Sequence, residues 1–246
     1  MAALASTISR PNLLQAIDRN ELSVAFQPQL TADGQSVASV EALLRWRLPD
    51  GGFISPETAV AHAEREGLID MVGLYVLQQA CTAARAWPGL VLAVNISPTH
   101  FAKPGFVDDV ARVLDATWFP ANRLEIEIVE SAAFDDPDHA SRQIERLHAI
   151  GARVAMDDFG TGYSSLSYLR NLPLDCLKID KSLVMDVSIL VAVIQLARSF
   201  RLKTIAEGVE DEHLATLLRE LGCDMAQGYH FARPMPLSRL MALEIK

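Results

Sequence analysis

The stretch at residues 154–165 reads Val154-Ala155-Met156-Asp157-Asp158-Phe159-Gly160-Thr161-Gly162-Tyr163-Ser164-Ser165. An apolar strand runs into two adjacent carboxylates and then into a turn that is rich in glycine and hydroxyl groups. Neighbouring residues of a strand point to opposite faces, so Asp157 and Asp158 can share one site only where the strand ends. Two carboxylates at such a point repel each other unless a cation lies between them. The alternative is a solvated turn that Asp158 caps.

The size and composition of the chain restrict its class. It has 246 residues, half of them hydrophobic, which is the length of a single-domain barrel. The net charge of -9 argues against broad adhesion to duplex nucleic acid or to a membrane surface. Three widely separated cysteines, no apolar run of 18 residues and no basic leader segment predict a cytoplasmic protein.

Strand and helix patterns alternate on both sides of residues 154–165. An antiparallel pair of strands is expected at 21–30 and 37–46, around a turn at 31–35. Further strands are expected at 90–96, 124–130, 153–158, 174–180, 203–207 and 223–227. Helices are expected at 11–20, 56–66, 69–87, 105–117, 138–150, 164–169, 188–200, 211–221 and 237–243. Repeated strand–helix units imply a parallel sheet, and about eight strands in one domain favour a closed α/β barrel over an open sheet.

Polar side chains gather at the predicted strand ends, where the chemistry of such barrels is found. These residues are Glu41, Asn95, Glu127, Glu130, Asp157, Asp158, Lys178, Asp180, Glu207 and Gln227. Donors that are almost all carboxylates, without His or Cys, favour Mg2+ or Mn2+ over zinc. The carboxylates exceed the needs of one ion, so a two-metal centre that activates water against a phosphate ester is expected.

Several blocks of sequence, in a fixed order, resemble the EAL-domain cyclic-di-GMP phosphodiesterases. The blocks are Phe26-Gln27-Pro28, Glu41-Ala42-Leu43-Leu44-Arg45-Trp46, Asn95-Ile96-Ser97, Glu127-Ile128-Val129-Glu130-Ser131, residues 157–165, Leu177-Lys178-Ile179-Asp180, Ala206-Glu207-Gly208-Val209-Glu210 and Gln227-Gly228-Tyr229-His230-Phe231-Ala232-Arg233-Pro234. The resemblance implies a TIM-like (β/α)8 barrel with one antiparallel strand near the N-terminus. It also implies hydrolysis of cyclic di-GMP to linear pGpG with two Mg2+ or Mn2+ ions. Residues 21–246 would form this barrel, and residues 1–20 a helical lead-in or linker from an upstream domain.

The resemblance also implies roles for individual residues. The first metal would be held by Glu41, Asn95, Glu127 and Asp157. The second would be held by Asp157 and Asp158, with Gln227 supporting the metals through water. Lys178 and Glu207 would orient or deprotonate the attacking water. The resemblance does not say whether one of these residues is the general base or whether a metal-bound hydroxide needs none. Substrate contacts would come from Gln27, Leu44, Arg45, Asp180 and Glu210. Glu130 would anchor the loop after Asp158, and this loop would control Asp158. The loop comprises Phe159, Gly160, Thr161 and Gly162.

Departures from the family pattern leave these ligands intact. Val129 stands where Thr is usual, His230 replaces a residue that is more often apolar, and the connection after Lys181 is short. A catalytically inactive domain that serves as a cyclic-di-GMP receptor is the main alternative, and the complete ligand set favours the enzyme. Glu41 could instead pair with Arg45 or Arg47.

Three further expectations concern residues and partners outside the metal centre. Glu125 is expected at the rim or surface, and most of the six histidines at the surface. The family also suggests a homodimer, and a sensory or diguanylate-cyclase-like domain upstream.

Overall fold

Eight strands close into a ring in the computed structural model, which describes residues 10–134, 136–160 and 166–242. The strands are β1 Leu22–Thr31, β2 Val37–Arg47, β4 Val91–Ile96, β5 Leu124–Val129, β6 Arg153–Phe159, β7 Cys176–Ile179, β8 Lys203–Ala206 and β9 Met225–Ala226. Their order is β1-β9-β8-β7-β6-β5-β4-β2, and β1 also pairs with β2 to close the barrel. A short strand, β3 Phe53–Ile54, extends β2 outside the ring.

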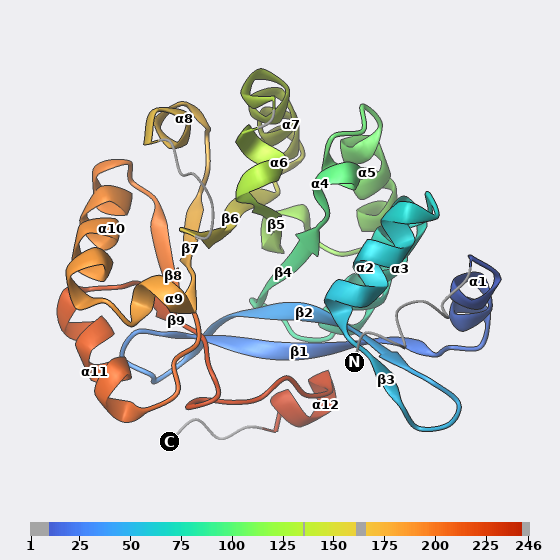
Figure 1. The fold of residues 1–246 in the computed structure, drawn as a ribbon, viewed down its shortest axis with the longest axis horizontal. Coiled ribbons are helices and arrows are strands. Elements are labelled where there is room, and N and C mark those ends of the chain that lie inside the picture. Colours follow the sequence, from blue (N-terminus) through green and yellow to red (C-terminus); the bar gives the residue numbers. More distant parts are fainter. Residues whose placement is uncertain (1–9, 135, 161–165, 243–246) are drawn as a thin grey trace.

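The strand β1 is antiparallel to both of its neighbours, β2 and β9. The other seven strands of the ring, β2 and β4 to β9, are parallel to one another. In Figure 1 β1 and β2 run side by side, and α12 lies below them. The predicted fold, a TIM-like (β/α)8 barrel with one antiparallel strand near the N-terminus, is confirmed.

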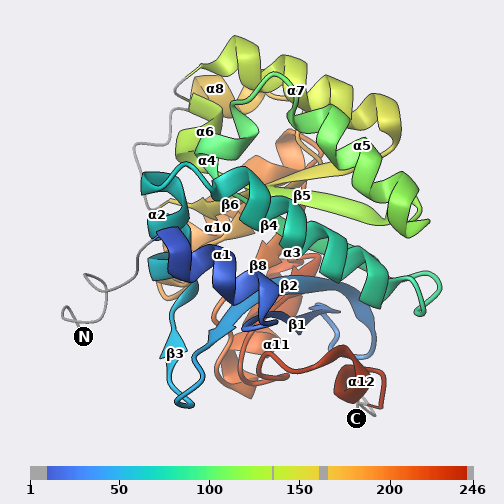
Figure 2. The same ribbon diagram turned by 90° about the vertical axis from the view of Figure 1, so that its right-hand side faces the viewer.

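Helices surround the strands on the outside (Figures 1 and 2). They are α1 Arg10–Asp18, α2 Pro56–Arg65, α3 Ile69–Ala84, α4 Pro98–Phe101, α5 Phe106–Thr117, α6 Glu130–Phe134, α7 Pro137–Ile150, α8 Leu166–Asn171, α9 Lys181–Val184, α10 Val187–Ser199, α11 Glu212–Leu221 and α12 Leu237–Leu240. The side chain of Asp136 caps the start of α7, and Gly151 ends it with a φ of 98°, a left-handed conformation that favours glycine. None of the helices in the described ranges is both long and apolar enough to cross a bilayer.

The alternation of side chains along each strand separates an apolar layer from a polar interior. In β5 the residues Leu124, Ile126 and Ile128 are fully buried and belong to the core between the strands and the helices. Each such side chain contributes about 1.5–3 kcal/mol when it leaves water. The intervening residues Glu125 and Glu127 point into the barrel. A smaller apolar cluster inside the barrel includes Ala155, Cys176 and Ile205.

Five short elements were not predicted from the sequence: β3, α4, α6, α9 and a 3-10 helix at Ala121–Arg123. The helices α4, α6 and α9 each begin just after a barrel strand, and two of them begin at a side-chain cap. Ser97 accepts a hydrogen bond from the backbone of His100, and Asp180 accepts one from the backbone of Ser182. The predicted strand at 124–130 ends one residue earlier, because Glu130 is already the first residue of α6.

Candidate active site

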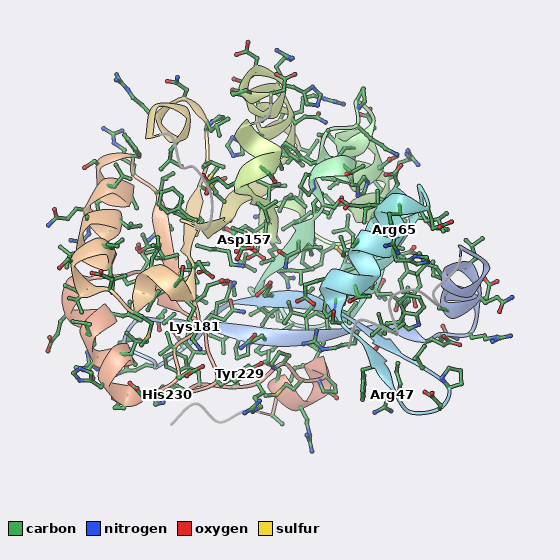
Figure 3. All side chains as sticks on the ribbon, in the orientation of Figure 1. Arg47, Arg65, Asp157, Lys181, Tyr229 and His230 are labelled. Carbon is green, nitrogen blue, oxygen red and sulfur yellow. The ribbon has the colours of Figure 1, made fainter. Side chains whose placement is uncertain are left out.

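The predicted site residues converge at one end of the barrel. Asn95 and Lys178 precede the last residue of β4 and β7, whereas Glu207 and Gln227 directly follow β8 and β9. Figure 3 shows Asp157 in the middle of the ring of strands. Glu41 lies within β2 rather than at its end, because β2 continues past the barrel to pair with β3. Parallel strands thus bring residues far apart in sequence to one place.

Lys178 lies at the centre of the carboxylates and is fully buried. Its Nζ lies 2.9 Å from a carboxylate oxygen of Asp157, 2.9 Å from Glu207, 3.0 Å from Glu127 and 3.7 Å from Glu41. Burial alone would lower the pKa of Lys178, but the surrounding carboxylates raise it well above its ordinary value. The lysine is therefore a fixed positive charge. Its apolar neighbours Leu177 and Ile179 belong to the core on the other face of β7.

A single lysine does not neutralise this many carboxylates. Burial raises the pKa of Glu127 well above its ordinary value, and it raises the pKa of Glu207 to about 7. Burial and the neighbouring Asp157 also raise the pKa of Asp158. Glu41 differs: burial would raise its pKa, but Lys178 and amide donors together lower it. The centre has an excess of negative charge that further cations would stabilise.

The carboxylate oxygens fall into two groups that fit hard divalent cations. In one group oxygens of Glu41, Glu127 and Asp157 lie within 4.8 Å of one another, and in the other those of Asp157, Asp158 and Glu207 do. Asp157 belongs to both groups. All of these donors are oxygens, the ligands that Mg2+ and Mn2+ prefer. The sequence placed Glu207 with the water and not with the second group, so its position beside Asp158 is a finding of the structure.

Backbone geometry explains how two consecutive aspartates face one site. Asp158 has a φ of 53°, in the left-handed region that non-glycine residues seldom adopt. The pairing of β6 with β7 shifts between Met156 and Phe159 at the same point. The backbone N–H of Asp158 donates to Asp157 Oδ1 at 2.9 Å. The strand pattern is broken here, so the usual rule that neighbours face apart does not apply.

Amide side chains hold the carboxylates from the sides. Asn95 Nδ2 donates to Glu41 Oε1 at 2.5 Å, and Gln227 Nε2 donates to Glu41 Oε2 at 2.5 Å. The alternative in which Glu41 pairs with Arg45 or Arg47 is wrong, since its cation partner is Lys178. The buried Gln29 also contacts this group of residues, and it was not predicted because a glutamine within a strand carries no distinguishing signal.

A pocket of about 420 Å³ opens above the centre. Its lining residues are Gln27, Glu41, Asp157, Asp158, Lys181, Glu207, Gly208, Glu210, Gln227, Gly228 and Tyr229. Gln27 and Glu210 were predicted as substrate contacts, whereas Lys181 and Tyr229 were not predicted as site residues. Lys181 forms an ion pair with Glu210, and the guanidinium of Arg233 lies 4.2 Å from the centre of the Tyr229 ring.

The other three predicted substrate residues do not line this pocket. Leu44 is buried on the opposite face of β2 from Glu41 and lines a second, largely apolar pocket of about 260 Å³, which Asn95 also borders. Arg45 shares the face of Glu41, and its guanidinium donates to the carbonyl of Leu44 at 2.8 Å. Asp180 caps α9. Burial would raise its pKa, but hydrogen bonds from Ser182 lower it.

The predicted control loop is described only in part. Phe159 is buried and Gly160 has a φ of 103°, whereas Thr161 and Gly162 lie outside the described residues. Glu130 is buried, and within the described parts of the chain neither of its carboxylate oxygens has a hydrogen-bond partner.

One expectation about the surface is wrong, and another holds for four of the six histidines. Glu125 is only 5% exposed, because closure of the barrel encloses the face it shares with Glu127, and burial raises its pKa to about 6. Of the histidines, His62 and His100 are each 1% exposed. His62 lies on α2, whereas His100 lies against α3, where Gly73 leaves room for its ring: a Cβ at residue 73 would lie 2.6 Å from the His100 Nδ1.

The barrel and its oxygen-rich, lysine-centred site define an α/β-barrel protein suited to divalent cations. The family model of the EAL domain matches residues 10–234, and the chain belongs to this family.

Relatives with curated names cover most of the chain. It is 40% identical over 243 residues to the bifunctional diguanylate cyclase/cyclic di-GMP phosphodiesterase MucR of Pseudomonas aeruginosa, covering 94% of this chain and 36% of MucR. It is 40% identical over 241 residues to the cyclic di-GMP phosphodiesterase NbdA of the same organism, covering 93% of this chain and 31% of NbdA. The chain thus spans about a third of the length of these relatives.

A solved structure of the PaMucR phosphodiesterase, in complex with c-di-GMP, superposes with a TM-score of 0.89 at 39% identity. The match covers 94% of this chain and 98% of that one.

Proposed function

We propose that this chain hydrolyses one phosphodiester bond of cyclic di-GMP and releases linear pGpG. The observation that carries the proposal is the convergence of carboxylates from β2, β5, β6 and the end of β8 on one buried lysine of β7, beneath an open pocket. The names of MucR and NbdA, and the c-di-GMP bound to PaMucR, support this choice of substrate.

The centre would hold two Mg2+ or Mn2+ ions. One ion would be held by Glu41, Asn95, Glu127 and Asp157, and the other by Asp157 and Asp158, with Glu207 beside them. Bound ions of this kind lower the pKa of water and stabilise the leaving oxygen of a phosphate ester.

Two side chains of the protein can then act on the water. Burial raises the pKa of Glu207 above its ordinary value, which favours proton acceptance by its carboxylate. Lys178 stays protonated, and its Nζ can hold the water oxygen or offset charge on the phosphate. Attack at phosphorus forms one P–O bond, breaks the bond to a ribose O3′ and leaves a 5′-phosphate on pGpG.

The dinucleotide would extend beyond the metal centre into both pockets. Gln27 and Glu210 would contact it from the polar pocket, and one base would enter the apolar pocket around Leu44. The planar guanidinium of Arg45, on the same face as Glu41, would bind a phosphate oxygen.

Replacing Arg45 with methionine should therefore weaken substrate binding more than it slows turnover. Loss of a charge-assisted hydrogen bond, worth about 1.5–3 kcal/mol, corresponds to a rise in KM of roughly 10- to 100-fold. Steady-state kinetics of Arg45→Met and of the exposed-site control Arg239→Met would measure this. A KM for Arg45→Met equal to that of the control would remove Arg45 from the phosphate site.

Glu130→Ala should lower activity although, in the described parts of the chain, the Glu130 carboxylate forms no hydrogen bond to a proposed metal ligand. Glu130 follows Val129, which pairs with Asp157 across β5 and β6, so it can act on the segment that begins at Asp158. We expect a fall in kcat of about 10-fold or more with an unchanged melting temperature. Kinetics equal to those of the wild type would exclude this loop-control role.

The proposed reaction is tested by incubating the chain with cyclic di-GMP and Mg2+ or Mn2+, then separating the nucleotides by chromatography. We expect pGpG with metal and none when EDTA removes the metal. Tight nucleotide binding without product under either metal would favour the receptor alternative.

We also propose that the chain works as a cytoplasmic homodimer downstream of a further signalling domain. The support for the further domain is that the chain spans about a third of relatives such as MucR, whose name describes two activities. The homodimer and the location are expectations from the sequence.

A further inference from the structure

Two buried polar residues lie directly below the proposed metal centre and have no part in the proposed chemistry. Gln29 of β1 is fully buried and Ser39 of β2 is 4% exposed. The two face each other across the antiparallel pair, next to the register shift at Gln29 and Leu30. A polar amide inside a barrel is costly unless its hydrogen bonds are made.

The hydrogen bonds of Gln29 fix the direction in which its amide points. Ser39 Oγ donates to Gln29 Oε1. Gln29 Nε2 donates to Gln227 Oε1 at 2.9 Å and to Glu127 Oε1 at 3.4 Å. The reversed amide would turn its oxygen toward two other oxygens, so only one orientation satisfies this group.

The orientation of the Gln29 amide also determines the hydrogen bonds made to Glu127 and, through Gln227, to Glu41. Because Gln227 accepts from Gln29 through its oxygen, its Nε2 faces Glu41 Oε2 at 2.5 Å and Gln27 Oε1 at 3.2 Å. Glu127 is held between Gln29 on Oε1 and Lys178 on Oε2. Gln29 therefore acts on Glu127 directly and on Glu41 through Gln227.

We propose that Gln29 is a positioning residue of the metal centre and that the Ser39 hydroxyl sets the orientation of its amide. The inference rests on the proposed divalent-cation centre. Residues that orient metal ligands change metal affinity or activity by about 10- to 100-fold when they are replaced. The expected effect is on cation binding rather than on the pocket for the nucleotide.

Titration with Mn2+ alone, followed by isothermal calorimetry, tests the inference without any reaction. Gln29→Met keeps the length of the side chain but removes its donors, and we expect the Kd for Mn2+ to rise about 10-fold or more. Ser39→Ala should weaken Mn2+ binding, and Ser39→Thr, which keeps the hydroxyl, should restore it. The control is Gln79→Met, which changes an exposed glutamine of α3.

Thermal unfolding of each metal-free variant separates a folding defect from a binding defect. A Gln29→Met variant that folds and binds Mn2+ within about twofold of the control would overturn the inference. If Gln29→Met does not fold, the two Ser39 variants test the inference instead. Equal Kd values of Ser39→Ala and Ser39→Thr for Mn2+ would overturn it. A wild-type chain that binds no Mn2+ would instead remove the cation centre itself, whereas loss of hydrolysis with intact Mn2+ binding would count only against the proposed reaction.

Discussion

Glu41→Gln should abolish hydrolysis of cyclic di-GMP, with a fall in kcat of about 1000-fold or more. The substitution keeps the shape of the side chain but removes its charge and one oxygen from the group formed with Glu127 and Asp157. A bound cation supplies several kcal/mol of transition-state stabilisation, and each 1.36 kcal/mol is worth about a factor of ten in rate. The measurement is the initial rate of pGpG formation at saturating Mn2+.

The matched control for this variant is Glu145→Gln, at an exposed position of α7. It makes the same chemical change far from the barrel interior and should leave the rate unchanged. The melting temperature of Glu41→Gln should stay within a few degrees of the control, because Lys178 retains its other carboxylate partners. Activity of Glu41→Gln close to that of Glu145→Gln would contradict the assignment of Glu41 as a metal ligand.

Lys178→Met should destabilise the metal-free protein by about 3–5 kcal/mol, the usual cost of leaving partners of a buried ion pair uncompensated. Methionine fills a similar volume, so the loss comes from the charge and not from a cavity. Mn2+ should recover part of this stability because it supplies positive charge to the same carboxylates. The measurement is urea unfolding with EDTA and with Mn2+, alongside turnover, which should remain low in both.

The pH dependence of this variant gives a second check. Without Lys178, the buried Glu127 and Glu207 keep raised pKa values, so the folded state holds protons that the unfolded chain has already released. Folding stability then falls as pH rises, and the deficit should be larger at about pH 8 than at about pH 5. The control Lys203→Met, at an exposed surface ion pair, should cost about 1 kcal/mol or less. A Lys178→Met variant as stable as this control in EDTA would contradict the account of the centre.

The barrel and most of its site could be predicted from the sequence because both follow from strand spacing and alternation. Lys178 lies between two apolar residues of a short strand, so its inward direction follows from the period of two. The EAL-type blocks then supplied roles that alternation alone does not reveal. These roles stay predictions until variants are measured.

Other features depend on geometry that one sequence does not encode locally. The left-handed Asp158 places two consecutive carboxylates in one site, against the rule for strands. Glu125 was misplaced because alternation gives its face, while only closure of the ring makes that face an interior. The burial of His100 depends on Gly73 of another helix. Each of these is set by contacts between distant segments.

Hydrolysis in water enriched in ¹⁸O tests the central claim most directly. The wild-type chain with cyclic di-GMP and Mn2+ should yield pGpG that carries one ¹⁸O atom in its 5′-phosphate, as mass spectrometry would show. No label should appear in the substrate that remains. Cyclic di-GMP that stays bound and intact under both Mg2+ and Mn2+, or pGpG without the label, would contradict hydrolysis by a water molecule at this centre.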